Sequence, residues 1–356
     1  DWLDTNVVQG GAELARRALV GAPPWRVGLI ADGVVAGAGT VLTFLPILII
    51  FFAVLGLLED VGYMARAAYV MDRFMHTMGL HGKSFLPLFL GFGCNVPAVA
   101  GARIIDSPRA RLLTIQLAPL VPCTARLAVI AFLVPAFFGR GAALVAVGLV
   151  FLNLFILALA GILISRFVFK GTHVAFIMEL PLYHTPNGRT IGMFVWQNTM
   201  AFLRKAGSII LIVSVIVWAL SAFPGPGLEN SVMGRVGLWL APIGQMMGLD
   251  WQPMAALMTS FVAKENAIAT LGVLYGSGEE AVGLGETMAI HISPAAALAF
   301  LAATMLFIPC AATLATIRQE TNGWRWPLFN VGLLLAISLT VGIVIYQGAT
   351  LAGWGV

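Results

Sequence analysis

Charge is scarce in this sequence. Lys, Arg, Asp and Glu together make up 10% of the chain, whereas 60% of its residues are hydrophobic. A soluble globular domain carries about a quarter charged residues because its surface faces water. The composition therefore excludes an ordinary soluble domain and predicts that most of the surface faces lipid. The net charge of +4 comes from dispersed basic residues, so we expect no nucleic-acid partner.

Cysteine is equally scarce, and the common catalytic motifs are missing. Cys94, Cys123 and Cys310 lie in apolar stretches and cannot form a closed disulfide set. Residues 82–84 (GKS) resemble the end of a P-loop, but Thr77 stands where that motif needs a glycine. No nucleophile elbow, zinc HExxH motif or dinucleotide fingerprint occurs, and the histidines show no H-x-x-x-H spacing. We therefore expect neither an enzyme nor a bound cofactor in this chain.

Long hydrophobic runs fill most of the sequence. Six are long and apolar enough for membrane spans: 28–58, 112–138, 141–165, 206–223, 295–317 and 327–352. Two more are interrupted, 85–102 by glycines and Pro97, and 253–274 by Lys264-Glu265 at its centre. Interrupted segments more often line a cavity or re-enter the membrane than face lipid. The sequence predicts an all-α, polytopic membrane protein.

Polar segments divide these runs. Residues 59–84 are amphipathic and predict an interfacial helix with a short loop, and residues 224–252 form a linker with a short apolar helix near Trp239. The longest polar linker is 170–203. We expect an extramembrane segment at 1–27, a first repeat at 28–168, a cytoplasmic linker at 169–203 and a second repeat at 204–356. The chain starts at Asp1 without an initiator methionine, and we expect it to be a fragment.

An internal repeat supports this division. The run PCTARLA at 122–128 recurs as PCAATLA at 309–315, and each copy follows an interrupted segment and precedes one further span. When the interrupted segments are taken as re-entrant, most Lys and Arg residues fall on the side of the 170–203 linker, which is then cytoplasmic. The two copies then cross in opposite directions. This topology predicts two inverted repeats, each with an interrupted or re-entrant helix, and a substrate site near the midplane.

The three cysteines are the leading candidate metal ligands. Each follows a helix-disturbing residue, which is Gly93, Pro122 or Pro309. A proline inside a helix removes a backbone hydrogen bond and frees a carbonyl, so each thiol is expected beside carbonyl oxygens. Ferrous iron accepts sulfur, nitrogen and oxygen ligands. The thiols therefore predict relay sites for a partly dehydrated metal ion, although free cysteine also packs as a small buried hydrophobe.

Three ionisable residues, Arg126, Lys264 and Glu265, lie at predicted membrane depth. A charge at the bilayer centre costs at least about 2.5–3.5 kcal/mol, so such residues usually face a cavity and pair. We expect Glu265 to line the pathway as a carboxylate ligand, while Lys264 caps carbonyls or pairs elsewhere. The alternative is a structural ion pair, such as Arg126 with Glu265.

Amides and acids next to these residues have two interpretations. Asn95 and Asn266 each follow a candidate ligand, and they either satisfy backbone groups freed at the break or give an oxygen to the cation; the structural role is favoured. Glu59 and Asp60 end the first span. They either concentrate cations at a cytoplasmic mouth through the local field or cap the interfacial helix with Arg66.

Six motifs carry a family resemblance: LEDVGYMAR at 58–66, GFGCNVP at 91–97, PCTARL at 122–127, ELPLY at 179–183, AKE at 263–265 and PC at 309–310. With them, the chain resembles the transmembrane part of the FeoB-type ferrous iron transporters over about residues 20–350. Asn266 departs from the family pattern, where a β-branched apolar residue is more usual. The loop at 275–290 is short for the family.

The resemblance implies a paired gate architecture, ferrous iron as the transported substrate and inward movement across the bacterial cytoplasmic membrane. It places the family's metal-path cysteines on Cys94, Cys123 and Cys310 and its acidic position on Glu265. It also implies a G domain, with GTP and Mg²⁺, outside these residues, so no GTPase activity is expected here. The implied partners are the lipid bilayer, that G domain, small cytosolic accessory proteins and a second copy in a homo-oligomer.

Two other classes of function stay open at this level. An ion-coupled secondary transporter of a nucleoside-like solute also uses paired gate repeats, with Glu265 then serving as the proton or sodium site. An intramembrane enzyme or a structural scaffold is the remaining class. No catalytic dyad favours the enzyme, and a scaffold does not need charged residues at depth.

Overall fold

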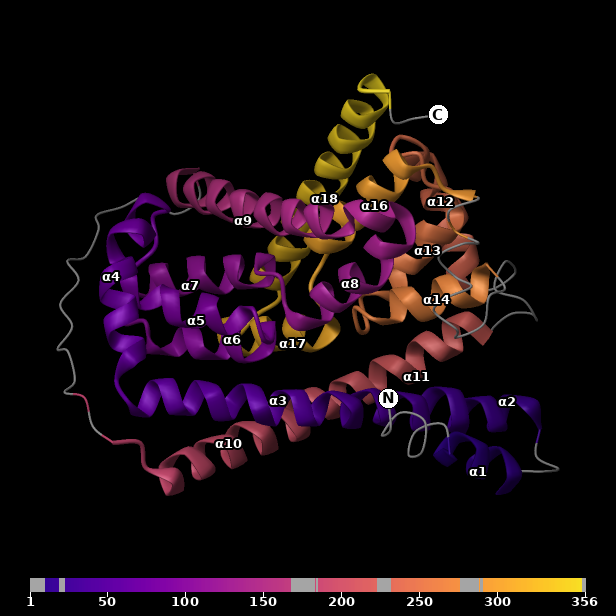
Figure 1. Cartoon of the computed structure of the whole chain (residues 1–356). Coiled ribbons are helices and arrows are strands. Elements are labelled where there is room, and N and C mark those ends of the chain that lie inside the picture. The colour runs from indigo at the N-terminus through magenta and orange to yellow at the C-terminus, as the bar shows by residue number, and fades with distance from the viewer. Residues whose placement is uncertain are drawn as a thin grey trace. The chain divides into compact units, whose positions relative to one another are not determined.

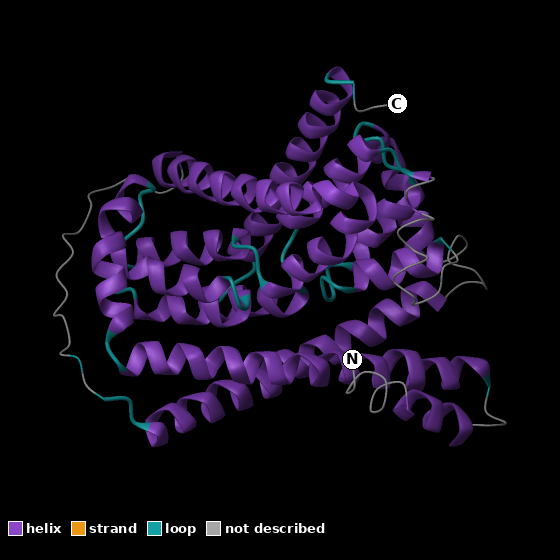
Figure 2. Ribbon diagram, in the orientation of Figure 1, coloured by secondary structure: helices purple, strands orange, loops and turns teal. Residues whose placement is uncertain are grey.

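The computed structural model describes residues 10–18, 23–167, 183, 185–222, 232–275, 288 and 291–353. These residues form helices and loops, with no strand among them (Figure 2), so the predicted all-α fold is confirmed. Five helices are long and apolar enough to cross a membrane: Arg26–Asp60, Pro108–Phe138, Ala142–Phe167, Pro294–Thr321 and Arg325–Leu351. These helices indicate a multi-pass membrane protein.

The helices of the two halves of the chain follow one another in the same order (Figure 1). The first series is α3 (Ala36–Asp60), α4 (Tyr63–Thr77), α5 (Phe85–Gly91) with α6 (Asn95–Gly101), α7 (Pro108–Leu117) with α8 (Thr124–Phe138), and α9 (Ala142–Phe167). The second is α11 (Ser208–Ala222), α12 (Val232–Gln245), α13 (Trp251–Thr259) with α14 (Asn266–Leu274), α16 (Pro294–Leu306) with α17 (Ala311–Thr321), and α18 (Arg325–Leu351). The relative direction of the two series stays a prediction.

Further helices extend the first span of each series. The helices α1 (Gly10–Ala18) and α2 (Pro24–Gly28) precede a π-helical stretch, Leu29–Val35, that runs into α3. Likewise α10 (Gly188–Phe202) continues through a π-helical turn, Leu203–Gly207, into α11. A helix therefore begins at Gly188, inside the segment predicted as a linker at 169–203. Most of the earlier part of that segment lies outside the described residues.

Two compact units make up the chain. The first comprises residues 1–114 and 161–219, and the second comprises residues 115–160 and 220–356. They alternate along the sequence and so divide it differently from the repeats expected at 28–168 and 204–356. Those repeat boundaries stay a prediction.

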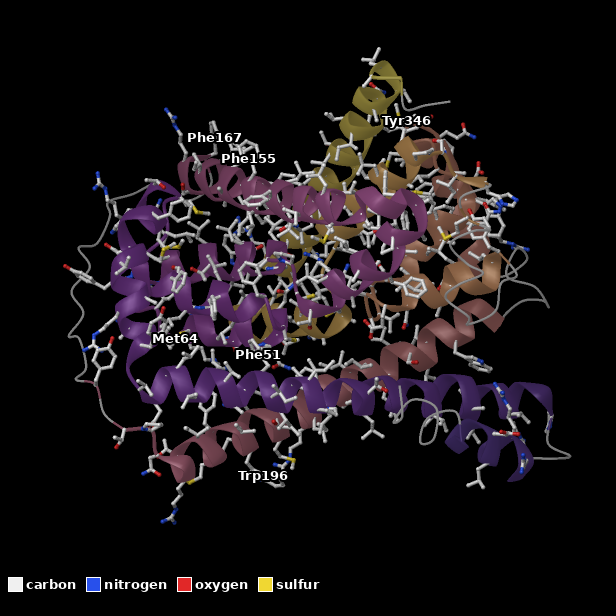
Figure 3. All side chains as sticks on the ribbon, in the orientation of Figure 1. Phe51, Met64, Phe155, Phe167, Trp196 and Tyr346 are labelled. Carbon is white, nitrogen blue, oxygen red and sulfur yellow. The ribbon has the colours of Figure 1, made fainter. Side chains whose placement is uncertain are left out.

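In the first unit, α3 lies alongside α10 (Figure 1). A buried cluster forms between α3 and α4 from Leu48, Phe52, Leu55 and Met64, with Phe194 and Phe202 of α10 packed against it. Phe51 lies on the side of α3 toward α5 and α6 (Figure 3), and its ring covers Gly93 so closely that a Cβ there would overlap it. The absence of a side chain at Gly93 thus allows α3 to approach the break between α5 and α6.

In the second unit, α16 is enclosed almost completely, because its alanine-rich surface packs against α18 and α8. Polar side chains of α18 are buried there and bonded: Ser338 donates to the carbonyl of Ala303 at 2.8 Å. Tyr346, labelled in Figure 3, packs on Gly248, whose φ of 68° lies in the left-handed region. Small residues thus let long helices come close together.

The two Pro-Cys spans, predicted at 112–138 and 295–317 with a proline that disturbs each helix, are completely broken. The first helix ends in a 3₁₀ turn at Ala118–Leu120 and restarts at Thr124, and the second ends at Leu306 and restarts at Ala311. Pro122 and Pro309 carry no amide hydrogen and disfavour a helical residue before them. The expected interruptions of 85–102 and 253–274 are confirmed, with breaks at 92–94 and 260–265.

A substitution at Gly93 tests the packing of the first unit. Gly93→Ala adds a methyl group where the ring of Phe51 lies, and overpacking of this kind costs about 1–3 kcal/mol. We expect a lower midpoint of thermal unfolding in detergent. Gly148→Ala is the matched control, since nothing lies within 4 Å of a Cβ there. Equal midpoints for the two variants would show that Phe51 does not pack on Gly93.

Candidate functional site

The four main candidate ligands occupy one kind of local position, immediately before a half-helix begins. Cys94 precedes α6, Cys123 precedes α8 and Cys310 precedes α17, each with an extended backbone. Glu265 stands at the same place before α14. The first amides of a helix have no partner within it, and its positive end favours anionic groups. Sulfur and carboxylate groups are therefore placed where the backbone itself favours negative charge.

Arg126 joins the two Pro-Cys breaks within the second unit. It lies in the first turn of α8, and its Nη1 donates to the carbonyl of Pro119 at 2.7 Å. Its Nη2 donates to the carbonyl of Phe307 at 2.6 Å. One guanidinium thus satisfies an oxygen freed in each break, because its fork of donors can serve two acceptors at once.

The break at 260–265, the third in the second unit, is hydrogen-bonded to the Pro-Cys break at 307–310. Lys264 donates from Nζ to the carbonyl of Ile308 at 2.5 Å. In return, the first amide of α17, at Ala311, donates to the carbonyl of Phe261 at 2.8 Å. The breaks at 121–123, 260–265 and 307–310 therefore form one hydrogen-bonded group. We call it the clasp: Pro119, Arg126, Phe261, Lys264, Phe307, Ile308 and Ala311.

The cations of the clasp are buried and held by carbonyls. Arg126 is 1% exposed and Lys264 is 3% exposed. The Lys264 ammonium also lies 5.3 Å from the centroid of the Phe307 ring, within cation–π range. No carboxylate of the described residues lies within ion-pair distance of Arg126, so the alternative of a pair with Glu265 is wrong. The expectation that Lys264 caps carbonyls is confirmed.

Thr313 is a residue at this site that sequence reasoning missed. Its hydroxyl lies 3.2 Å from the sulfur of Cys310, and its side chain is fully buried. In the P-C-x-A-x-L-A repeat it stands at the place of Arg126. A polar residue three positions after a cysteine on a helix faces that cysteine. This spacing is the signal that would have found it.

The candidates of the first unit have separate surroundings. Cys94 packs at the edge of the α3–α4 cluster, and Asn95 begins α6 and is 5% exposed. Asp60 accepts a hydrogen bond from the backbone amide of Asn187 at 2.7 Å, which ties the end of α3 to the start of α10. This favours a structural role for Asp60, although its partner is not Arg66. Glu59 beside it is exposed.

The guanidinium of Arg66 lies over the ring of Tyr183 instead, 3.2 Å from its centroid. It therefore takes no part in capping α4, whose N-terminal cap is Gly62. Within the described ranges, no three His, Cys, Asp or Glu side chains are arranged to hold one metal ion. Each candidate ligand thus precedes its own half-helix.

Comparisons with known families give two matches. Residues 41–137 and 203–324, more than half of the chain, match the Gate family, described as nucleoside recognition. Residues 146–198 match the ferrous iron transport protein B C terminus. The Fe(2+) transporter FeoB of Staphylococcus aureus (strain COL) is 38% identical over 334 residues, which cover 92% of this chain and 50% of the relative. This chain belongs to the FeoB family.

Two other FeoB relatives match this chain with a similar identity and coverage. The Fe(2+) transporter FeoB of Methanocaldococcus jannaschii is 38% identical over 89% of this chain and 49% of its own length. A fusion of Fe(2+) transport protein A with FeoB in Porphyromonas gingivalis is 38% identical over 90% of this chain and 44% of its own length. The chain thus spans about half the length of the FeoB relatives it matches. No solved structure matches it.

Replacing Arg126 tests the clasp. Arg126→Met keeps an unbranched apolar chain but leaves the carbonyls of Pro119 and Phe307 unbonded, at about 1–3 kcal/mol each. We expect a clearly lower unfolding midpoint in detergent, with Arg126→Lys between the variant and the parent. Arg318→Met is the control, since that guanidinium lies over a surface ring, Trp324. The clasp is refuted if Arg126→Met unfolds at the same midpoint as the control.

Proposed function

We propose that this chain is the conducting membrane part of a FeoB-type transporter and moves ferrous iron inward across the bacterial cytoplasmic membrane. One observation carries the proposal: in a chain of the FeoB family, three cysteines and one glutamate each stand immediately before a half-helix. The relatives it matches are named Fe(2+) transporters. Gating is assigned to a GTP-binding domain, with GTP and Mg²⁺, outside these residues.

Ferrous iron must exchange part of its water for protein ligands to cross the bilayer. Cys94, Cys123 and Cys310 offer sulfur, and Glu265 offers a carboxylate, all of which this metal accepts. The positive end of each half-helix favours the negative charge of such ligands. Asn95, directly after Cys94, supports the break there. Because each ligand precedes a different half-helix, we expect the ion to pass from one ligand to the next in a relay.

We place this relay at the interface of two inverted repeats near the membrane midplane, with the 169–203 segment in the cytoplasm. The recurring order of helices in the two halves supports the repeats. The relative in which Fe(2+) transport protein A is fused to FeoB supports a small cytosolic partner. A homo-oligomer completes the proposed assembly.

A nucleoside-like solute is the second candidate substrate. It is favoured by the Gate family match, whose description is nucleoside recognition. In that case Glu265 serves as a proton or sodium site, and the cysteines are packing residues. The two candidates differ in whether thiols touch the substrate.

Cysteine variants separate the two functions. Cys94→Ser, Cys123→Ser and Cys310→Ser are expected to slow Fe²⁺ uptake into proteoliposomes by about tenfold or more, as loss of a metal-site partner does. Uptake is measured anaerobically with the complete protein and GTP. Met247→Leu, which removes a buried sulfur that packs on Gly342, is the control and should transport normally. Normal iron uptake by all three serine variants, together with nucleoside uptake, would favour the second candidate.

A further inference from the structure

A break in a membrane helix exposes carbonyl oxygens, which are hard ligands. Oxygen-rich sites suit Mg²⁺ and Ca²⁺, whereas sulfur selects softer and borderline metals such as iron. A pathway built from helix breaks therefore presents two kinds of ligand side by side. The metal it favours depends on which kind is accessible.

In the second unit the clasp occupies such oxygens. The carbonyls of Pro119 and Phe307 accept from Arg126, and that of Ile308 accepts from Lys264. The carbonyl of Phe261 accepts from the amide of Ala311. Both side-chain donors are buried and reach these oxygens at 2.5–2.7 Å. A cation that used the carbonyl of Pro119, Phe307 or Ile308 would lie directly beside a tethered guanidinium or ammonium, which repels it.

The cysteines at the same breaks differ from these carbonyls in their burial and contacts. Cys123 and Cys310 are free cysteines and are partly exposed. The hydroxyl of Thr313 lies 3.2 Å from the sulfur of Cys310, and no cationic side chain is bonded to that sulfur in the part of the chain that the structure describes. At both Pro-Cys breaks, the cysteine residue is thus less buried than the residues that carry the bonded carbonyls, Pro119, Phe307 and Ile308.

We propose that Arg126 and Lys264 determine metal specificity by withholding backbone oxygens from the passing ion. This inference rests on the proposed transport of ferrous iron. The two side chains do not bind the metal; they position the carbonyls of Phe307 and Ile308 away from it. Their positive charges also oppose every cation, and only an ion that gains bonding to sulfur recovers that cost. Fe²⁺ is thereby favoured over Ca²⁺ and Mg²⁺.

A purely structural role for the clasp makes a different prediction. If Arg126 and Lys264 only hold the breaks together, their loss slows the transport of all metals equally. If they withhold oxygens, their loss changes the ratio of rates for different metals. Specificity is a difference of two affinities, so the ratio isolates this effect from stability and expression.

The test compares Fe²⁺ and Ca²⁺ uptake by the complete protein in proteoliposomes. Lys264→Met frees the Ile308 carbonyl, and we expect the Fe²⁺/Ca²⁺ ratio of initial rates to fall about tenfold, as when one interaction of hydrogen-bond strength is gained. Lys264→Arg retains a donor and should keep the ratio of the parent. In the same way, Arg126→Met should lower the Fe²⁺/Ca²⁺ ratio, and Arg126→Lys should keep the ratio of the parent. Arg318→Met should change nothing.

A measurement on the unaltered protein does not depend on how the variants fold. Fe²⁺ should slow the alkylation of Cys310 by a maleimide, whereas a tenfold excess of Ca²⁺ should not. Equal protection by both ions overturns the inference. The inference is also overturned if Lys264→Met and Arg126→Met keep the Fe²⁺/Ca²⁺ ratio of the parent, including the case in which uptake of both metals slows equally. This holds when the cysteine variants still impair iron uptake. If the cysteine variants transport iron normally, it is the proposed function that fails.

Discussion

Carbonyl oxygens released where membrane helices break are the constraint on which this structure depends. The bilayer core holds no water to satisfy them, and each unsatisfied group costs several kcal/mol there. A buried cation is also unfavourable at that depth. Arg126 and Lys264 resolve both problems at once, because their donors meet the free oxygens of Pro119, Phe307 and Ile308. The breaks and the buried cations therefore stabilise each other.

The two Pro-Cys elements use the same framework differently. In the first, the residue three positions after the cysteine is Arg126, which reaches into both breaks. In the second it is Thr313, which contacts its own cysteine. Arg126 of the first copy donates the hydrogen bond that joins the two breaks, and the carbonyl of Phe307, before the second copy, accepts it. This asymmetry explains how a repeated sequence forms a single hydrogen-bonded group rather than two independent kinks.

Local sequence patterns were sufficient for the helices and for two of the breaks, because glycines before Cys94 and a charged pair at 264–265 interrupt apolar runs. They were insufficient for the Pro-Cys spans. A proline in an apolar run produces either a kink or a full break, and the outcome depends on donors for the freed carbonyls. The donor for Phe307 is 181 residues away at Arg126. The start of α10 was missed for another reason, since it lies in the polar stretch 170–203, where the side chain of Asn187 caps the helix by accepting from the amide of Arg189.

The Gate family match bears on which substrate such broken helices bind. Its description concerns nucleosides, whereas the relatives of this chain are named iron transporters, so related frameworks are associated with unlike substrates. The backbone of a broken helix offers the same amides and carbonyls whatever its sequence. In the proposed function, the choice of substrate therefore comes from the side chain placed before each half-helix. Here that residue is cysteine at three breaks and glutamate at the fourth. With the carbonyls of four clasp residues already bonded, we propose that the side chains at these breaks determine what is bound.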